Sequence, residues 1–177
     1  MKIKLVLISL LATSRILMAG ISPTESEHLQ FMREEEKLAH DVYTVLYQKY
    51  GNPQFGNISF AEQRHTESVS FIMARYGVKD PALAAPGKFS NQELQALYDA
   101  LIAKGLKSRE DAFKVGILIE ETDIADLDAA IEETSTPDLI NLFENLKDGS
   151  YNHLKAFTKG LESLTATNGG GKNKGRR

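Results

Sequence analysis

Residues 28–50 read HLQFMREEEKLAHDVYTVLYQKY, and apolar side chains recur in this segment every three or four positions. This spacing places them on one face of an α-helix, so we expect the segment to form an amphipathic helix. The face runs through Met32, Glu36, Ala39, Tyr43 and Leu46. Its second position is a carboxylate, and a lone charge is almost never buried without a partner. The chemical role of Glu36 is therefore the first question that the sequence raises.

The same periodicity continues through most of the chain. Helices are predicted over about residues 22–50, 59–76, 90–104, 108–133 and 137–164. Ser, Asn or Pro stands at each predicted start, and Ser59 with Glu62 has the spacing of a capping box. No stretch alternates with period two for long enough to predict a strand. Four long helices, with an extra short helix in the connection between the second and third, predict an all-α, ferritin-like four-helix bundle.

Composition narrows the function classes. The chain of 177 residues has no cysteine, which excludes disulfides, thiolate zinc sites, iron–sulfur clusters and thiol catalysis. Seven of its 21 basic residues lie in the first 19 and last six positions, so the body is strongly acidic. An acidic body argues against nucleic-acid binding, which needs clustered Lys and Arg, and is suited to handling cations.

Both ends differ from this body. Lys2 and Lys4 precede a short apolar run over residues 5–12, as in a secretory signal, so residues 1–19 are expected to be a signal peptide and the protein to be exported. The cleavage position is open, and an attached amphipathic helix is the alternative. We expect a helical domain over residues 20–167 and a disordered basic tail over residues 168–177.

Each of the other three long helices also has a polar interruption in its apolar face. These interruptions are Glu62 and His65, Glu120, and His153. Ionisable side chains from different helices that face one core are most simply explained as ligands of a shared cation. Glu62 and His65 form Glu-x-x-His, which places both on one helical face. Oxygen and imidazole ligands favour iron or manganese, and zinc also accepts them.

Plainer interpretations exist for each residue taken alone. Glu62 fits a capping box, and a single histidine such as His65 is more often a hydrogen-bonded core residue. Glu35 is an alternative to Glu36, because it shares a face with other apolar residues of the first helix. Tyr43 could hydrogen-bond a ligand or act in electron transfer, or simply fill the core with its hydroxyl satisfied.

Four segments resemble rubrerythrins, which are ferritin-like di-iron carboxylate proteins: residues 36–43 (EKLAHDVY), 62–65 (EQRH), 120–123 (EETD) and 153–157 (HLKAF). A fuller match, from FMREEEKLA at residues 31–39 to GSYNHL at residues 149–154, is to a widespread bacterial and archaeal ferritin-like family of unassigned function. The resemblance covers about residues 25–165. It implies a ferritin-like fold and the following metal ligands: Glu36, Glu62, His65, Glu120, Asp123 and His153.

One departure concerns the number of ions. The superfamily usually has Glu-x-x-His in its fourth helix, but Ser150 stands at the glutamate position here. Asp123 could supply the missing charge; otherwise the site holds one ion, or two that are bound unequally.

The resulting expectation is an exported metal-binding protein with one or two iron ions, or manganese or zinc in their place. If it is an enzyme, it would act as an iron-dependent oxidoreductase of the ferroxidase or peroxidase type. The alternatives are a non-catalytic metal-binding protein and a purely structural bundle. Metal ions are the expected partners, with no nucleic acid and no membrane after signal removal, and a homodimer is compatible with the sequence.

Overall fold

The computed structural model describes residues 20–170, and this range contains five helices and no strand. The helices are α1 (Pro23–Tyr50), α2 (Pro53–Tyr76), α3 (Gln92–Gly105), α4 (Arg109–Glu132) and α5 (Pro137–Gly170). The all-α class predicted from the sequence is confirmed. The predicted signal segment at residues 1–19 and the basic end from residue 171 lie outside the described residues.

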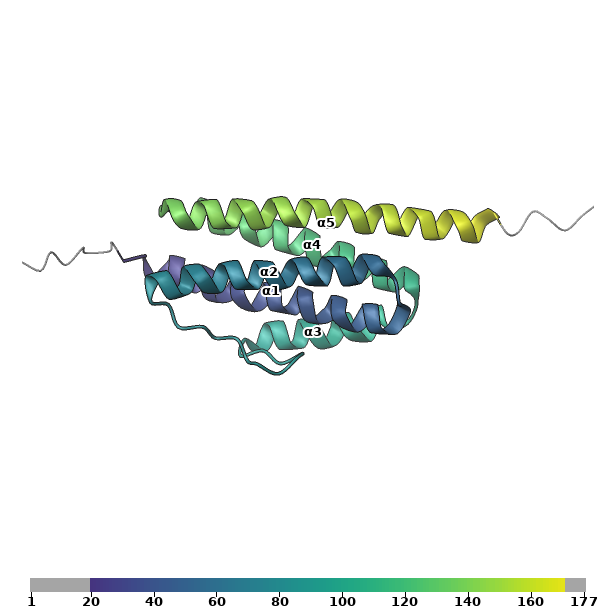
Figure 1. Ribbon diagram of the computed structural model, residues 1–177, viewed down its shortest axis with the longest axis horizontal. Helices are drawn as coiled ribbons and strands as arrows, with labels where there is room; N and C mark the ends of the chain where they lie inside the picture. The colour runs from purple at the N-terminus through teal and green to yellow at the C-terminus, as the bar shows by residue number, and fades with distance from the viewer. Residues whose placement is uncertain (1–19, 171–177) are drawn as a thin grey trace, which may run out of the picture.

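The four long helices α1, α2, α4 and α5 run along the long axis of the molecule, and α3 lies beside α1 (Figure 1). α1 packs mainly on α2 and α4 mainly on α5, while α1 with α4 and α2 with α5 join these two pairs. In Figure 1, α2 and α4 run in the same direction, and residues 77–91 with α3 carry the chain back between them. Among residues 20–170, no helix is both long enough and apolar enough to cross a membrane.

The start of α2 differs from the prediction. α1 ends at Tyr50 and is capped by Gly51, whose φ of 63° is left-handed; α2 begins at once with Asn52 as its N-cap and Pro53 in its first turn. The Asn52 side chain accepts a hydrogen bond from the Gln54 amide at 2.9 Å. Ser59 therefore lies inside α2, and Glu62 is released from the predicted capping role to face the core. The local Ser-x-x-Glu match was misleading, because Asn-Pro already supplies the helix start.

The last helix is longer than predicted. α5 continues to Gly170 rather than ending near Leu164, and it includes residues 168–170, which the sequence assigned to the tail. No proline stands between Leu164 and the glycine run to stop it. The other predicted boundaries agree with the structure to within about two residues, as expected of boundaries in general.

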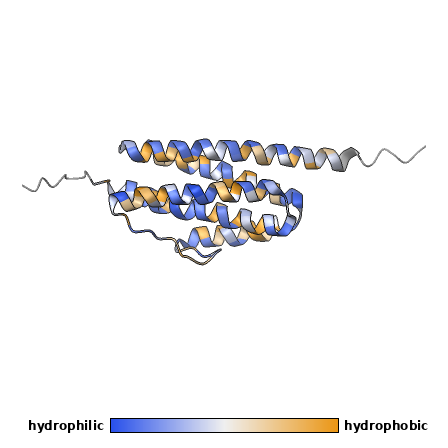
Figure 2. Ribbon diagram, in the orientation of Figure 1, coloured by the Kyte–Doolittle hydropathy of each residue, from blue (hydrophilic) through white to orange (hydrophobic). Residues whose placement is uncertain are grey.

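Two hydrophobic clusters fill the interior, one toward each end of the bundle. The first contains the aromatic group Tyr43, Phe55, Phe113 and Phe157, whose ring centroids are 5.0–6.5 Å apart. The second contains, among others, Leu29, Met32, Val69, Leu127 and Phe143. Figure 2 shows both hydrophilic and hydrophobic residues along each helix, as amphipathic helices require.

The boundary between the two clusters falls at the same level on every long helix. On α1 it lies between Met32 and Leu38, and on α2 between Ile58 and Val69. On α4 it lies between residues 119 and 127, and on α5 between residues 146 and 157. The predicted metal ligands occupy these intervals, so the core is interrupted by a single polar layer.

Several buried charges of α1 serve the connections instead. Glu34 accepts hydrogen bonds from the amides of Ser90 and Asn91, at 2.6 and 3.0 Å, where α3 begins. Asp41 accepts from Lys37 Nζ at 2.5 Å and from the Gly87 amide at 2.8 Å. These contacts fix the connection over residues 77–91 against α1, because a buried backbone amide without a partner is costly.

Glu25 plays the corresponding part for α5. Its carboxylate accepts hydrogen bonds from the amides of Ser135 and Thr136, at 3.0 and 2.9 Å, and from the Ser22 amide at 2.8 Å. Burial alone would raise the pKa of Glu25, but these donors outweigh it and hold the pKa at about 2. The charged carboxylate is therefore favoured in the folded chain.

Replacing this carboxylate by an amide should weaken the fold. We expect Glu25→Gln to lower the free energy of unfolding by about 1–3 kcal/mol at neutral pH, because charged hydrogen bonds are lost. The folded pKa of about 2 lies below the ordinary 4.5, so the difference from wild type should shrink as the pH falls from 4.5 toward 2. Urea denaturation measures both effects, with Glu27→Gln, exposed in the same turn, as the control. Equal stability of the two variants at neutral pH would contradict this role.

Candidate metal centre

The carboxylate of Glu62 lies between two histidines in the polar layer. Its Oε2 is 2.8 Å from His65 Nδ1, and its Oε1 is 2.8 Å from His153 Nδ1. Glu36 Oε2 approaches His65 Nδ1 at 3.1 Å, and Glu120 Oε2 approaches His153 Nδ1 at 3.6 Å. Two three-residue groups result, each with its ligand atoms within 4.8 Å of one another, and they share Glu62.

The hydrogen bonding of this layer is incomplete. Among the described residues, five buried side-chain atoms have no hydrogen-bond partner. Four belong to predicted ligands and the fifth to Glu35, which precedes Glu36: Glu35 Oε2, Glu36 Oε1, Glu62 Oε1, Asp123 Oδ1 and His153 Nδ1. Glu62 Oε1 and His153 Nδ1 are close, but they are not aligned for a hydrogen bond. Buried polar atoms are normally satisfied, so unsatisfied donors and acceptors that converge are consistent with a cation between them.

Five of the six predicted ligands thus come together, and Asp123 lies beside them. The single hydroxyl hydrogen of Ser150 Oγ is directed to Asp123 Oδ2, and the Leu146 carbonyl also lies 3.2 Å from this oxygen. Asp123 belongs to neither three-residue group. Its second oxygen, Oδ1, is buried without a partner. Ser150 therefore does not replace the carboxylate expected from the resemblance; it orients one on the facing helix.

The sequence left open the choice between Glu35 and Glu36 and the role of Tyr43, and the structure shows where these side chains lie. Glu36, not Glu35, supplies an atom to the three-residue groups, although both side chains are buried. Tyr43 is fully buried, and its hydroxyl donates to Glu120 Oε1 at 2.6 Å, so it positions a candidate ligand. His40 is held by the Ser59 carbonyl at 2.8 Å and takes no part in the cluster.

Sequence reasoning missed the role of Gly149 on α5. The rings of His65 and His153 stack with centroids 5.6 Å apart, which requires α2 and α5 to approach closely. A Cβ atom at residue 149 would lie 2.6 Å from His65 Cε1, a distance that real contacts do not reach. Only glycine at this position leaves the space that the His65 ring occupies.

Burial and neighbouring charges shift the pKa values in opposite directions. Burial, reinforced by the charge of Glu62, raises the pKa of Glu36 and Glu120 to about 8. Burial would also raise that of Glu62, but contact with His153 and His65 outweighs it and lowers the pKa to about 2. Adjacent carboxylates overcome the effect of burial on the histidines, raising the pKa to about 11 for His65 and about 10 for His153.

These shifts describe the layer without a cation at neutral pH. Glu62 is ionised between two protonated histidines, while Glu36 and Glu120 mostly keep their protons. Protons therefore limit the buried charge that the carboxylates would otherwise accumulate. A metal ion in either group would have to displace protons from one histidine and one outer carboxylate, so metal affinity should rise with pH.

The family model described as "Uncharacterized protein domain (DUF2202)" matches residues 25–170. The chain belongs to this family. An uncharacterized protein of Methanocaldococcus jannaschii, MJ0754, is 45% identical to the DUF2202 chain over 144 residues, covering 81% of this chain and 78% of that protein. The crystal structure of hypothetical protein MJ0754 from Methanococcus jannaschii superposes with a TM-score of 0.81 at 44% identity, over 82% of this chain and 83% of that one.

A second solved structure has a similar fold at much lower sequence identity. The crystal structure of a DUF305 fragment from Deinococcus radiodurans matches with a TM-score of 0.65 at 12% identity. The match covers 81% of the DUF2202 chain and 99% of the fragment. At this identity the similarity concerns the fold alone.

Removing the charge of Asp123 should stabilise the metal-free chain. Burial raises the pKa of Asp123 well above 3.8, so the folded state loses stability as the pH rises above that value. Asp123→Asn keeps an acceptor for Ser150 without the charge. We expect the chelator-treated variant to be more stable than wild type by about 1–3 kcal/mol at about pH 8, and by less at about pH 5.

Urea denaturation of chelator-treated protein at both pH values provides the measurement. Glu121→Gln is the matched control, because Glu121 is exposed two residues away on α4. A variant that is less stable than wild type at the higher pH would show that Asp123 is favourably paired in the metal-free fold.

Proposed function

We propose that the DUF2202 chain is a ferritin-like four-helix bundle of α1, α2, α4 and α5, with α3 as an extra helix, that binds one or two iron ions in its polar layer. One observation supports this proposal most strongly. Two groups of potential ligand atoms share the Glu62 carboxylate, and several of these buried atoms have no hydrogen-bond partner. The parallel course of α2 and α4, joined by a connection that includes α3, supports the ferritin-like topology.

The residues have distinct roles in this proposal. Glu36 and His65 would hold one ion and Glu120 and His153 a second, and Glu62 would contribute its carboxylate to both groups. Asp123 offers its free oxygen at the edge, where Ser150 keeps it oriented. Carboxylate oxygens with imidazole nitrogens favour iron or manganese, and zinc fits the same ligand types.

Bound iron would supply redox chemistry toward oxygen or peroxide, which makes the protein an iron-dependent oxidoreductase of the ferroxidase or peroxidase type. The chain contributes a site shielded at each end by a hydrophobic cluster. Tyr43 fixes Glu120 through its 2.6 Å hydrogen bond, which limits the movement of that carboxylate when its charge changes. The positive start of the chain and its apolar run support export of this protein.

Metal binding is tested by stoichiometry. Chelator-treated wild type, titrated anaerobically with Fe(II) or aerobically with Mn(II) or Zn(II), should bind up to two ions and melt at a higher temperature. Glu62→Gln should lose most of both ions, because both groups need its charge. His65→Ala and His153→Ala should each bind about one ion fewer than the wild type. The affinity of each variant for the ion that it still binds should fall about 10- to 100-fold.

His28→Ala is the control, because His28 pairs with Glu133 outside the layer. Calorimetry gives the number of ions, and metal analysis after dialysis confirms it. Unchanged melting temperature and no retained metal in the wild type would favour the purely structural bundle and contradict the proposal.

Catalysis needs a separate measurement. With Fe(II) added, we expect the wild type to accelerate oxygen or peroxide consumption beyond the rate of Fe(II) alone, and Glu62→Gln to lose this acceleration. An oxygen electrode and a peroxide assay provide the rates, with His28→Ala again as control. Tight metal binding without acceleration by either oxidant would identify a non-catalytic metal-binding protein.

A further inference from the structure

The outer face of α2 carries two strongly exposed aromatic side chains. Phe60 is 60% exposed and Phe71 is 68% exposed, the two highest values among the large hydrophobic residues described. Arg64 and Glu67 lie between them and are also exposed. The steps of four, three and four residues place all four on one narrow stripe of the helix, opposite the buried face that includes Glu62.

This stripe is symmetric about its own centre. Phe60 and Phe71 are equally distant from the midpoint between His65 and Thr66, and so are Arg64 and Glu67. When such a helix is turned end over end, each phenylalanine replaces the other, and the positive position falls on the negative one. The stripe is therefore complementary, in both shape and charge, to an antiparallel copy of itself.

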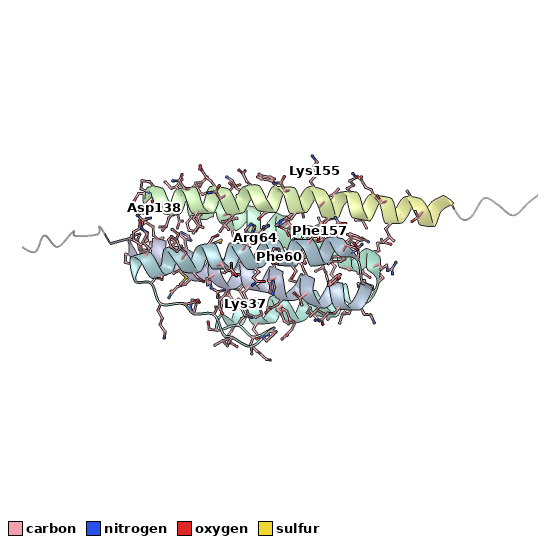
Figure 3. All side chains as sticks on the ribbon, in the orientation of Figure 1. Lys37, Phe60, Arg64, Asp138, Lys155 and Phe157 are labelled. Atoms are coloured by element: carbon pink, nitrogen blue, oxygen red, sulfur yellow. The ribbon has the colours of Figure 1, made fainter. Side chains whose placement is uncertain are left out.

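The two charges are available for such a pairing. The Arg64 guanidinium lies over the Phe60 ring, 5.2 Å from its centroid, and the two residues are neighbours along α2 in Figure 3. Glu67 accepts a hydrogen bond from Gln63 of its own helix at 3.2 Å. Neither Arg64 nor Glu67 takes part in a salt bridge among the described residues.

We propose that the chain forms a two-fold symmetric dimer in which α2 packs antiparallel on α2 of a second copy. Phe60 contacts the partner's Phe71, and Arg64 pairs with the partner's Glu67, each contact occurring twice. Arg64, Glu67 and Phe71 of the stripe also line a groove between α2 and α5. Most of its other lining residues are polar, but Ile72 and Leu142 lie beside Phe71 and give the partner's Phe60 apolar side chains to contact. Aromatic anchors with an arginine are typical of the centre of an interface.

The symmetry favours a second copy over other occupants. A different protein would need no mirrored placement of the two phenylalanines or of the two opposite charges. The charges of Arg64 and Glu67 cancel, so the stripe has no net attraction for an anionic membrane surface. The dimer also leaves the metal layer free, because the stripe lies on the side of α2 away from Glu62. Assembly and metal binding are therefore independent.

Charge reversal tests both the partner and the register. Sedimentation velocity of the full chain over a range of concentrations should show a monomer–dimer equilibrium that weakens with added salt. Arg64→Glu and Glu67→Arg should each raise the dimer dissociation constant about tenfold or more, because both salt bridges become like-charge contacts. Phe71→Ser should weaken the dimer as well. Lys155→Glu, exposed on α5, should leave it unchanged.

Two combinations should restore the dimer. The double variant Arg64→Glu with Glu67→Arg re-forms both pairs with the charges exchanged. An equimolar mixture of the two single variants should form mixed dimers, because one chain then presents two acids to two arginines. Circular dichroism shows whether each variant is folded. A wild type that stays monomeric, or single reversals that leave the dimer intact, would overturn the proposal. So would reversals that neither combination rescues.

Discussion

The contact of one carboxylate with two histidines organises this protein. Glu62 touches His65 of its own helix and His153 of α5, so α2 and α5 must meet at one level, with Gly149 providing the space. Glu36 and Glu120 then bring α1 and α4 to the same level. Because these groups can lie only where the apolar faces stop, the core divides into one cluster on each side of the layer.

Burying charge is costly, and the chain deals with that cost in two ways. Glu25 and Glu34 accept hydrogen bonds from backbone amides at the starts of α5 and α3, so their burial strengthens the connections. In the polar layer, no backbone amide of residues 20–170 donates to Glu36 or Glu62, and histidines and protons compensate the charge instead. Protons can be exchanged for a cation whereas backbone amides cannot, which separates the candidate ligands from the structural carboxylates in this fold.

Most residues of the polar layer could be predicted, because the face of a helix on which a residue lies follows from the sequence of that helix alone. Phase alone selected Glu36, Glu62, Glu120 and His153 from their apolar neighbours. It could not decide firmly between Glu35 and Glu36, since adjacent positions both border the buried face. Contacts between distant segments were beyond it: Ser150 meets Asp123, and Glu25 meets residues 110 positions away, only through the packing of α4 and α5 on the rest. The start of α2 was mistaken because two capping signals competed locally.

The two faces of α2 show why its composition is unusual for a surface helix. Its inner face gives up apolar packing to Glu62 and His65, while its outer face exposes Phe60 and Phe71 to solvent. Packed against the rest of the chain and without other partners, α2 would be more stable with the phenylalanines facing the core and the charges facing solvent. The proposed cation would stabilise the first reversal and the proposed dimer contact the second. Helix α2 thus carries the candidate metal ligands on one face and the proposed association surface on the other, without a shared residue.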